Sequence, residues 1–303
     1  MVNEKEMGAS VASRLKHRFV YALIFLGGRW LAYLFLYPLV LFYTLMPSIR
    51  AKARPYVSRR FGVSRGPAFF KHVYLLNLTF AKTLADRAAL GILGRVEIHS
   101  SDADRALCRD LLSRGNGLVL VTAHCGCWQM AAANVDFIAA PKYVLYYKNP
   151  KDNDKMVHEH AGKKAPFTLI NPAGPLGGVV EMMAALRGGS ALCAMGDRVF
   201  GKPDNSVSVP FLGAPVRLPY SFYRIAAAQR APVMMLFFPW LGGGKFGAEI
   251  AAVLDVPECG PDKENYRFCA ERFAGALEEF CRKYPYQFFN YFDLWENTHG
   301  ENH

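Results

Sequence analysis

The stretch Leu118-Val119-Leu120-Val121-Thr122, followed by Ala123-His124-Cys125-Gly126-Cys127-Trp128-Gln129, decides the fold of this chain. Four aliphatic residues and a threonine are too few for a helix and predict a strand that is buried on both faces. Such continuous apolar strands are typical of parallel sheets, because helices cover both faces of the sheet. The stretch therefore predicts an α/β sheet with His124 just beyond a strand end, in the crevice before a helix.

Helices and strands alternate along the rest of the chain after Lys71. The further strands are expected at residues 143–147, 167–170, 191–195, 232–239 and 246–256. The helices are expected at residues 104–114, 126–140, 152–162, 176–187 and 221–230, and after Pro261-Asp262. This alternation predicts an α/β domain over residues 72–303, with a layered, largely parallel or mixed sheet flanked by helices.

Residues 1–71 differ from the rest of the chain in charge. They hold 12 basic and 2 acidic residues, whereas the remainder holds 24 basic and 23 acidic residues. A nucleic-acid-binding protein would instead carry a basic stripe across its folded body, so we expect no nucleic-acid partner. The composition, with 52% hydrophobic residues and 7 cysteines in 303 residues, excludes a disordered chain and a small disulfide scaffold.

An apolar segment at residues 19–46 lies between the basic residues. Of its 28 residues 23 are apolar, and Gly27-Gly28-Arg29 and Pro38 interrupt it. Basic flanks around an apolar segment are typical of proteins at anionic membrane surfaces. We therefore expect residues 1–71 to form a membrane-associated helical region, in which residues 19–46 are a helix or helical hairpin embedded in one leaflet. A single span is the second interpretation and a buried core helix the third.

A second candidate strand end carries charged residues. The strand at residues 191–195 leads into Gly196-Asp197-Arg198, and a Gly/Pro-rich loop is expected at residues 209–219. Because chemistry in such sheets lies at the carboxyl ends of strands, Asp197 and Arg198 are expected near His124 if the two strands are neighbours. A histidine there can act as a general base, or it can be a structural hydrogen-bonding residue.

In this order, these pieces resemble the bacterial late lipid A acyltransferases and their relatives in the lysophospholipid acyltransferase superfamily. That family has a strand ending in His, then Gly, Asn, Trp and an acid in an H-x-x-x-x-D/E pattern. Here His124, Gly126 and Trp128 match, and Gln129 stands at the acid position. A later strand of the family ends in Asp, here Asp197, followed by a V-P-F-x-G-x-P loop, here residues 209–215. The closing residues 284–295 look closest to a branch of predicted acyltransferases.

The resemblance implies a membrane-bound acyltransferase on the cytoplasmic face of the inner membrane. His124 would remove a proton from a hydroxyl of a membrane lipid, which attacks an acyl thioester on acyl carrier protein or coenzyme A. The sequence shows no obvious counterpart of the family's arginine between the two blocks, so Arg198 is taken as its substitute. Arg198 and backbone N–H groups near Gly126 are the candidates to stabilise the oxyanion, and Trp128 is expected to contact substrate. The resemblance implies no cofactor and no metal.

The chain departs from the family pattern at two positions. Gln129 replaces the acid and Cys127 replaces the asparagine. Gln129 can orient His124 but brings no charge, so either Asp197, or less favourably Asp136, supplies the carboxylate, or the protein is a catalytically weak or inactive lipid-binding relative.

Three other sites are possible in principle. His124, Cys125 and Cys127 suggest a metal site, but consecutive residues rarely converge on one ion. Cys125 is next to His124 but points to the opposite face of an extended chain, which favours a buried thiol over a nucleophile. His158 and His160 are expected on a solvated helix face.

Overall fold

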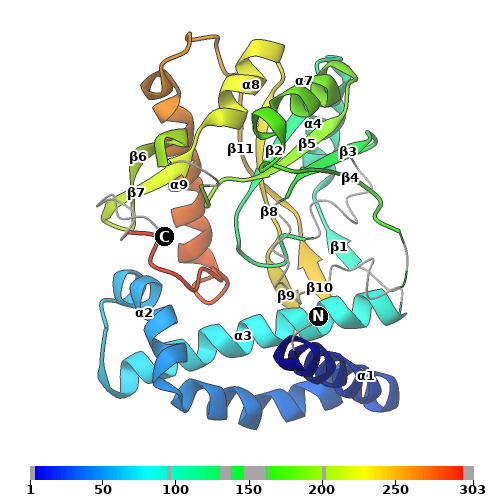
Figure 1. Cartoon of the computed structure of the whole chain (residues 1–303), viewed down its shortest axis with the longest axis vertical. Helices are drawn as coiled ribbons and strands as arrows, with labels where there is room; N and C mark the ends of the chain where they lie inside the picture. The colour runs from blue at the N-terminus through cyan, green and yellow to red at the C-terminus, as the bar shows by residue number, and fades with distance from the viewer. Residues whose placement is uncertain are drawn as a thin grey trace.

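The computed structural model describes residues 4–93, 97–129, 138–146, 162, 164–199 and 203–295, and Figure 1 shows the whole chain. Residues 130–137 and 147–161 lie outside the described part. Residues 152–161 of the helix expected at 152–162 and most of the helix expected at 126–140 therefore lie outside it too, as do Asp136, His158 and His160.

A six-stranded sheet forms the centre of the α/β body. Its order is β11-β8-β2-β5-β3-β4, and every neighbouring pair is parallel except β11, which is antiparallel to β8. The strands are β2 (Leu118–Thr122), β3 (Lys142–Leu145), β4 (Thr168–Ile170), β5 (Ala191–Met195), β8 (Val233–Phe237) and β11 (Glu249–Leu254). The predicted layered, mixed α/β sheet is confirmed. The strand expected at residues 246–256 is divided between β10 and β11.

Side chains of the central strands alternate between two apolar layers. Val119 and Val121 of β2 join one cluster of buried residues, and Leu118 and Leu120 join the other. The first face is covered by α7 (Val179–Arg187), α8 (Ser221–Gln229) and α9 (Arg267–Lys283), and the second by α4 (Asp102–Ser113). Short 3₁₀ turns lie in three of the connections: η1 (Pro175–Gly178), η2 (Pro203–Asn205) and η3 (Lys263–Tyr266).

The Gly/Pro-rich segment at residues 209–219 was expected to be a loop, and this prediction is wrong. It belongs to an antiparallel hairpin of β6 (Ser206–Phe211) and β7 (Ala214–Pro219). Alternate residues of β6 are buried in the core, and Pro210 pairs with Pro215 on this two-stranded ribbon. Proline is tolerated in such edge positions because no ladder hydrogen bond is lost. A second small sheet combines β1 (Glu97–His99), β9 (Trp240–Gly242) and β10 (Lys245–Gly247).

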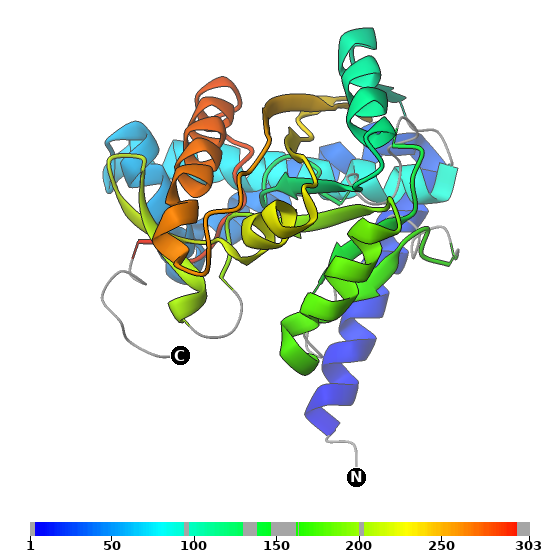
Figure 2. The ribbon, with the colours of Figure 1, turned by 90° about the horizontal axis from the view of Figure 1, so that it is seen from above.

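Three N-terminal helices form a layer below the body in Figure 1. They are α1 (Glu4–Leu45), α2 (Pro47–Phe61) and α3 (Gly66–Leu93). α3 runs across the expected domain boundary at residue 71, and α1 packs along α3. α1 is kinked at Gly27 and Gly28, where Gly28 has a φ of 64°. Seen from above, the first part of α1 projects beyond the body (Figure 2). Residues 21–45 are long and apolar enough to cross a membrane, and only 22% of that window is buried.

Candidate functional site

The register of the sheet brings His124 and Asp197 together. β2 and β5 are parallel neighbours, with Thr122 opposite Met195 at their carboxyl ends. His124 and Asp197 each follow two residues beyond these paired positions. Because parallel strands end at the same edge of the sheet, the two side chains meet in the crevice where ligands bind in this class of fold.

His124 is held by Asp197 through both its ring and its backbone. The ring atom Nδ1 lies 3.0 Å from each carboxylate oxygen of Asp197, and the backbone N–H of His124 donates to Oδ2 at 3.0 Å. The Asp197 side chain is fully buried, whereas the His124 side chain is 14% exposed. When Nδ1 carries the proton and donates it to the carboxylate, Nε2 has the free lone pair and can accept a proton from a substrate.

Asp197 is held in its charged form. Burial alone raises the pKa of its carboxyl group, but the charge of His124, the hydrogen bonds from His124 and the charge of Arg198 together bring the pKa below its ordinary value. Asp197 is therefore a carboxylate at neutral pH and stabilises a protonated His124. The guanidinium of Arg198, the next residue, lies 5.1 Å from the ring centre of Phe292.

The turn after His124 passes closely beside the end of β8. Gly126 has a φ of +53°, and a Cβ there would overlap the backbone carbonyl of Phe238. Its N–H donates to the Gln287 carbonyl at 2.8 Å, and the N–H of Cys127 donates to the Phe238 carbonyl at 2.8 Å. These two N–H groups are occupied, so neither of them serves as the oxyanion donor expected near Gly126. In the structure, the lack of a side chain at Gly126 allows the turn to lie close to the Phe238 carbonyl.

Aromatic side chains line the other side of His124. The Trp128 ring lies 5.2 Å from the His124 ring and 6.4 Å from Phe289. The N–H of Phe289 donates to the His124 carbonyl at 2.8 Å, and Cys125 forms an isolated antiparallel bridge with Phe288. The closing segment of the chain thus forms one wall of the site. Phe289 was missed in the sequence, because a backbone contact over so many residues leaves no local pattern.

Gln129 contacts α3. Its Oε1 accepts a hydrogen bond from Nη1 of Arg87, whose side chain is almost completely buried. The position at which the family pattern has an acid therefore faces a buried cation, while Asp197 contacts the histidine. Arg87 was also missed. The only signal in the sequence is the pair Asp86-Arg87, which interrupts an otherwise apolar stretch of α3.

The geometry can be compared with two other chemistries, a cysteine nucleophile at Cys125 and a metal site. Cys125 is fully buried, and burial raises the pKa of its thiol well above the ordinary value, so it remains a neutral thiol. Among the described residues, no group of three or more His, Cys, Asp or Glu side chains is arranged to hold a metal ion.

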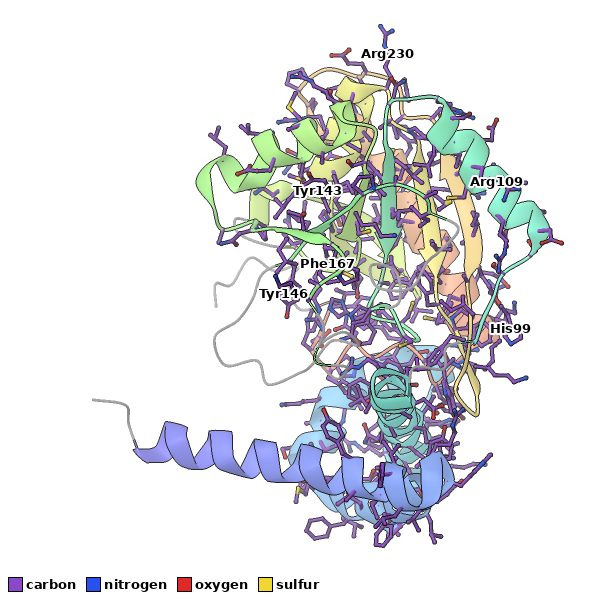
Figure 3. All side chains as sticks on the ribbon, turned by 90° about the vertical axis from the view of Figure 1, so that its right-hand side faces the viewer. His99, Arg109, Tyr143, Tyr146, Phe167 and Arg230 are labelled. Carbon is purple, nitrogen blue, oxygen red and sulfur yellow. The ribbon has the colours of Figure 1, made fainter. Side chains whose placement is uncertain are left out.

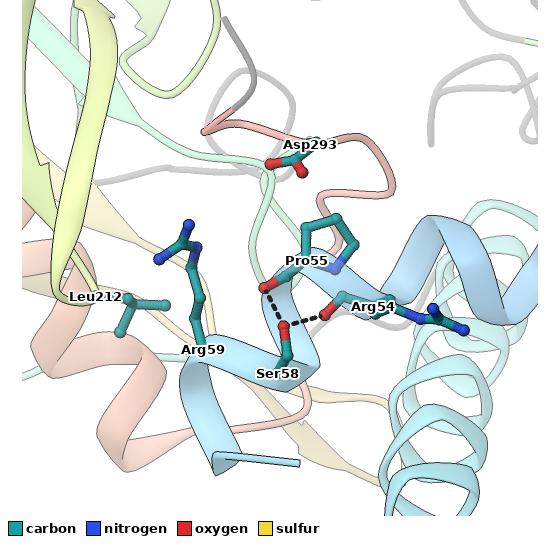
Figure 4. A pocket seen from close by; sticks show the side chains of 6 residues that line it. All are labelled: Arg54, Pro55, Ser58, Arg59, Leu212 and Asp293. Carbon is teal, nitrogen blue, oxygen red and sulfur yellow. Dashed lines mark hydrogen bonds between the residues drawn. The ribbon is translucent and has the colours of Figure 1, made fainter. Parts of the chain in front are cut away.

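A cavity of about 480 Å³ lies near the far end of the closing segment (Figure 4). It is lined by Arg54, Pro55, Ser58, Arg59, Leu212 and Asp293. Arg59 stacks on Trp295 at 4.6 Å from the ring centre. Leu212 belongs to the β6–β7 turn, so the V-P-F-x-G-x-P segment contributes to this cavity.

Comparison with known protein families gives a match over most of the α/β body. The family model described as bacterial lipid A biosynthesis acyltransferase matches residues 95–297, about two thirds of the chain. The match includes His124, Gln129, Asp197 and Arg198 and begins after α3. No curated protein matches the chain in sequence.

Proposed function

The chain belongs to the bacterial lipid A biosynthesis acyltransferase family, and we propose that it moves a fatty acyl chain from a thioester to a hydroxyl of a membrane lipid or glycolipid, with His124 as general base. The observation that carries the proposal is the contact of Nδ1 of His124 with the buried carboxylate of Asp197 at 3.0 Å. A histidine oriented by an ionised carboxylate is the arrangement that activates a hydroxyl for acyl transfer.

The reaction needs one base and no change of oxidation state. Nε2 of His124 takes the proton of the acceptor hydroxyl, whose oxygen attacks the thioester carbonyl. The tetrahedral intermediate then collapses: the C–S bond breaks, the new ester C–O bond remains, and the leaving thiolate receives the proton from the imidazolium. Asp197 stabilises that imidazolium by its charge and its hydrogen bond.

The negative charge on the carbonyl oxygen needs a positive donor. Arg198 follows Asp197 directly and rests on the Phe292 ring, so we assign it the oxyanion or substrate-binding role. Trp128, packed beside the His124 ring, is assigned to the wall that the substrate contacts. The N–H of Gly126 is excluded from this role by its bond to Gln287.

The second candidate function is a catalytically weak or inactive lipid-binding relative, in which Gln129 has disabled the pair. The two functions differ in whether a carboxylate reaches the ring of His124. Asp197 does so, which favours the enzyme. Gln129 instead accepts a hydrogen bond from Arg87 of α3.

The donor is proposed to be acyl carrier protein or coenzyme A carrying the acyl thioester. The acceptor is proposed to lie in the inner membrane, with the α/β body on the cytoplasmic side. The apolar helix near the N-terminus and the family membership support attachment to the inner membrane.

A direct assay tests the proposal. Purified full-length protein is incubated with acyl carrier protein or coenzyme A carrying labelled palmitate, together with a bacterial lipid extract, and labelled lipid products are measured. We expect His124→Ala to lower the rate about 10²–10⁴-fold. Arg109→Gln, on the exposed surface of α4, is the matched control and should retain the full rate. Equal rates for His124→Ala and wild type in folded protein would remove His124 from the mechanism.

A further inference from the structure

α1 presents a continuous apolar face to the outside. Large apolar side chains are exposed along its whole second part, including Leu26 at 79%, Trp30 at 70%, Leu34 at 65% and Leu45 at 58%. Within residues 21–45, the part of the helix whose side chains the structure describes, the other large exposed apolar residues are Phe25, Phe35, Tyr37, Leu39, Leu41, Phe42 and Tyr43. An apolar surface of this extent on one helix marks an interaction site.

The opposite face of the same helix is fixed to the body. Tyr33 donates to Oδ2 of the buried Asp86 at 2.6 Å, and the same oxygen accepts from Nε1 of Trp240 at 2.7 Å and from the N–H of Gly244 at 2.8 Å. One carboxylate of α3 thus joins α1 to the β9–β10 hairpin that follows β8. Since breaking these buried hydrogen bonds is unfavourable, the angle between α1 and the body is set by the fold.

The views agree on how α1 lies. It runs across the lower side of the molecule in Figure 1, and it again lies across that side after the quarter turn of Figure 3. In that view the labelled Arg109 of α4 lies at the upper right, away from α1. α3 lies above it over much of its length. The carboxyl ends of β2 and β8 face this helical layer, because Gln129 contacts Arg87 and Trp240 contacts Asp86.

Charged groups beside α1 oppose an upright position in a bilayer. Lys82 of α3 donates to the hydroxyl of Tyr37 at 2.8 Å, and its ammonium lies 4.4 Å from the centre of that ring. Tyr37 is near the middle of the apolar part. If α1 stood across the membrane, Lys82 and the attached part of α3 would enter the hydrocarbon, where a lysine is strongly unfavourable.

α2 adds positive charge next to this apolar face. It carries five basic residues and no acidic one, and Lys52, Arg54 and Arg59 are exposed. Arg50 donates to the carbonyls of Thr44 and Leu45, so the start of α2 is tied to the end of α1. Basic side chains beside an apolar helix face match an anionic lipid surface.

We propose that α1 lies flat in one leaflet of an anionic bilayer, with its exposed face in the acyl region and α2 at the headgroups. This orientation turns the helical layer and the carboxyl edge of the sheet, with His124, toward the membrane. It rests on the membrane-lipid acceptor of the proposed function and adds the way in which the acceptor's surface is bound.

Depth measurement separates a flat helix from a spanning one. Trp30 and Leu45 are 15 residues apart, or about 22 Å along a helix, and the hydrocarbon core is about 30 Å thick. Spin labels are placed on Trp30→Cys, Leu34→Cys, Leu41→Cys and Leu45→Cys in full-length protein with Cys259→Ser, because the other six native cysteines are buried. Vesicles of phosphatidylethanolamine and phosphatidylglycerol are used, and depth is read from the accessibility of each label to oxygen and to a water-soluble nickel chelate.

We expect all four labels at one shallow depth, within about one helical turn, or about 5 Å. Leu107→Cys, an exposed leucine of α4, is the matched control and should report water. Arg54→Gln and Lys52→Gln should each lower binding to these vesicles about fivefold, and should not change binding to phosphatidylcholine.

Two results would overturn the proposal. A steady change of depth of about 22 Å from Trp30 to Leu45 would show a spanning helix and leave the proposed acyl transfer intact. Labels that all report water would refute membrane binding by α1. The labelled-palmitate assay on the same preparations then shows separately whether acyl transfer fails.

Discussion

Among single residues, Asp197 is proposed to orient the ring of His124 and to stabilise its protonated form. Asp197→Asn keeps the shape of the side chain but removes the charge and allows the wrong tautomer of His124. We expect the acyl-transfer rate to fall about 10²–10⁴-fold, comparably to His124→Ala, and the double variant to be little worse than either single one. The acyl-transfer rates of Asp197→Asn, His124→Ala and the double variant, each compared with wild type, measure this. Independent, multiplying losses would show that the two residues do not act as one unit.

The stability of the protein should depend on Asp197 in acid. Its pKa is lower in the folded protein than in the unfolded chain, because His124 and Arg198 outweigh the effect of burial. The resulting stabilisation is complete above the unfolded value of about 3.9 and is lost as the pH falls through the folded pKa. The difference in unfolding free energy between wild type and Asp197→Asn should therefore shrink below about pH 4. A difference that does not change with pH would contradict this assignment.

Gln129 offers a test of the missing acid. Nη1 of Arg87 donates to Gln129 and would face a glutamate at this position. Gln129→Glu should therefore form a partly buried ion pair with Arg87, keep the melting temperature near that of wild type, and raise turnover if a charge at this position helps. The same change in an Arg87→Gln background should lower the melting temperature, because the new charge is unpaired. Equal melting temperatures in both backgrounds would exclude the pairing.

The sequence predicts part of the site for a physical reason. His124 and Asp197 end apolar strands, and parallel pairing aligns strand ends, so their proximity follows once the strands are neighbours. The contact of Arg87 with Gln129 depends on how α3 packs under the sheet, which no local periodicity encodes. The same holds for Phe289.

At the scale of secondary-structure elements, a substitution at Gly126 tests how closely the turn after β2 packs against the end of β8. Gly126→Ala places a methyl group against the Phe238 carbonyl at a positive φ, so it should destabilise the turn that holds His124. Gly115→Ala is the matched control, since Gly115 also has a positive φ but has open space around its Cβ position. We expect a loss of about 1–2 kcal/mol for the control and a clearly larger loss for Gly126→Ala in urea unfolding. Equal losses would mean that the close approach does not matter.

Elements with a strong local signal are predicted well. The strands at residues 118–122 and 191–195 match β2 and β5, because continuous apolar runs between glycines have few alternatives. The β6–β7 hairpin was missed because its prolines and Gly213 resemble a loop, and only the burial of alternate residues shows the strands. The kink of α1 at Gly27 and Gly28 was visible in the sequence, whereas its path along α3 was not.

At the scale of the whole molecule, the helical layer and the sheet face each other across the site. Charge and hydropathy predict a membrane-associated N-terminal region, but the same apolar length serves a spanning helix and a flat one. Our proposal of a flat helix rests on the packing of α1 on α3, where Tyr33 donates to Asp86, 53 positions away, and Lys82 donates to Tyr37. An acceptor lipid would reach His124 from the side on which α1 and α3 lie.

Lipid mass spectrometry of cells tests the central claim, acyl transfer by the His124–Asp197 pair, most directly. Cells that lack the gene are complemented with the wild type, with His124→Ala or with Arg109→Gln, at matched protein levels in the membrane fraction. We expect one lipid class to gain the mass of an acyl chain with the wild type and Arg109→Gln, and to lack it with His124→Ala. The same lipid profile with His124→Ala as with the wild type would contradict the account.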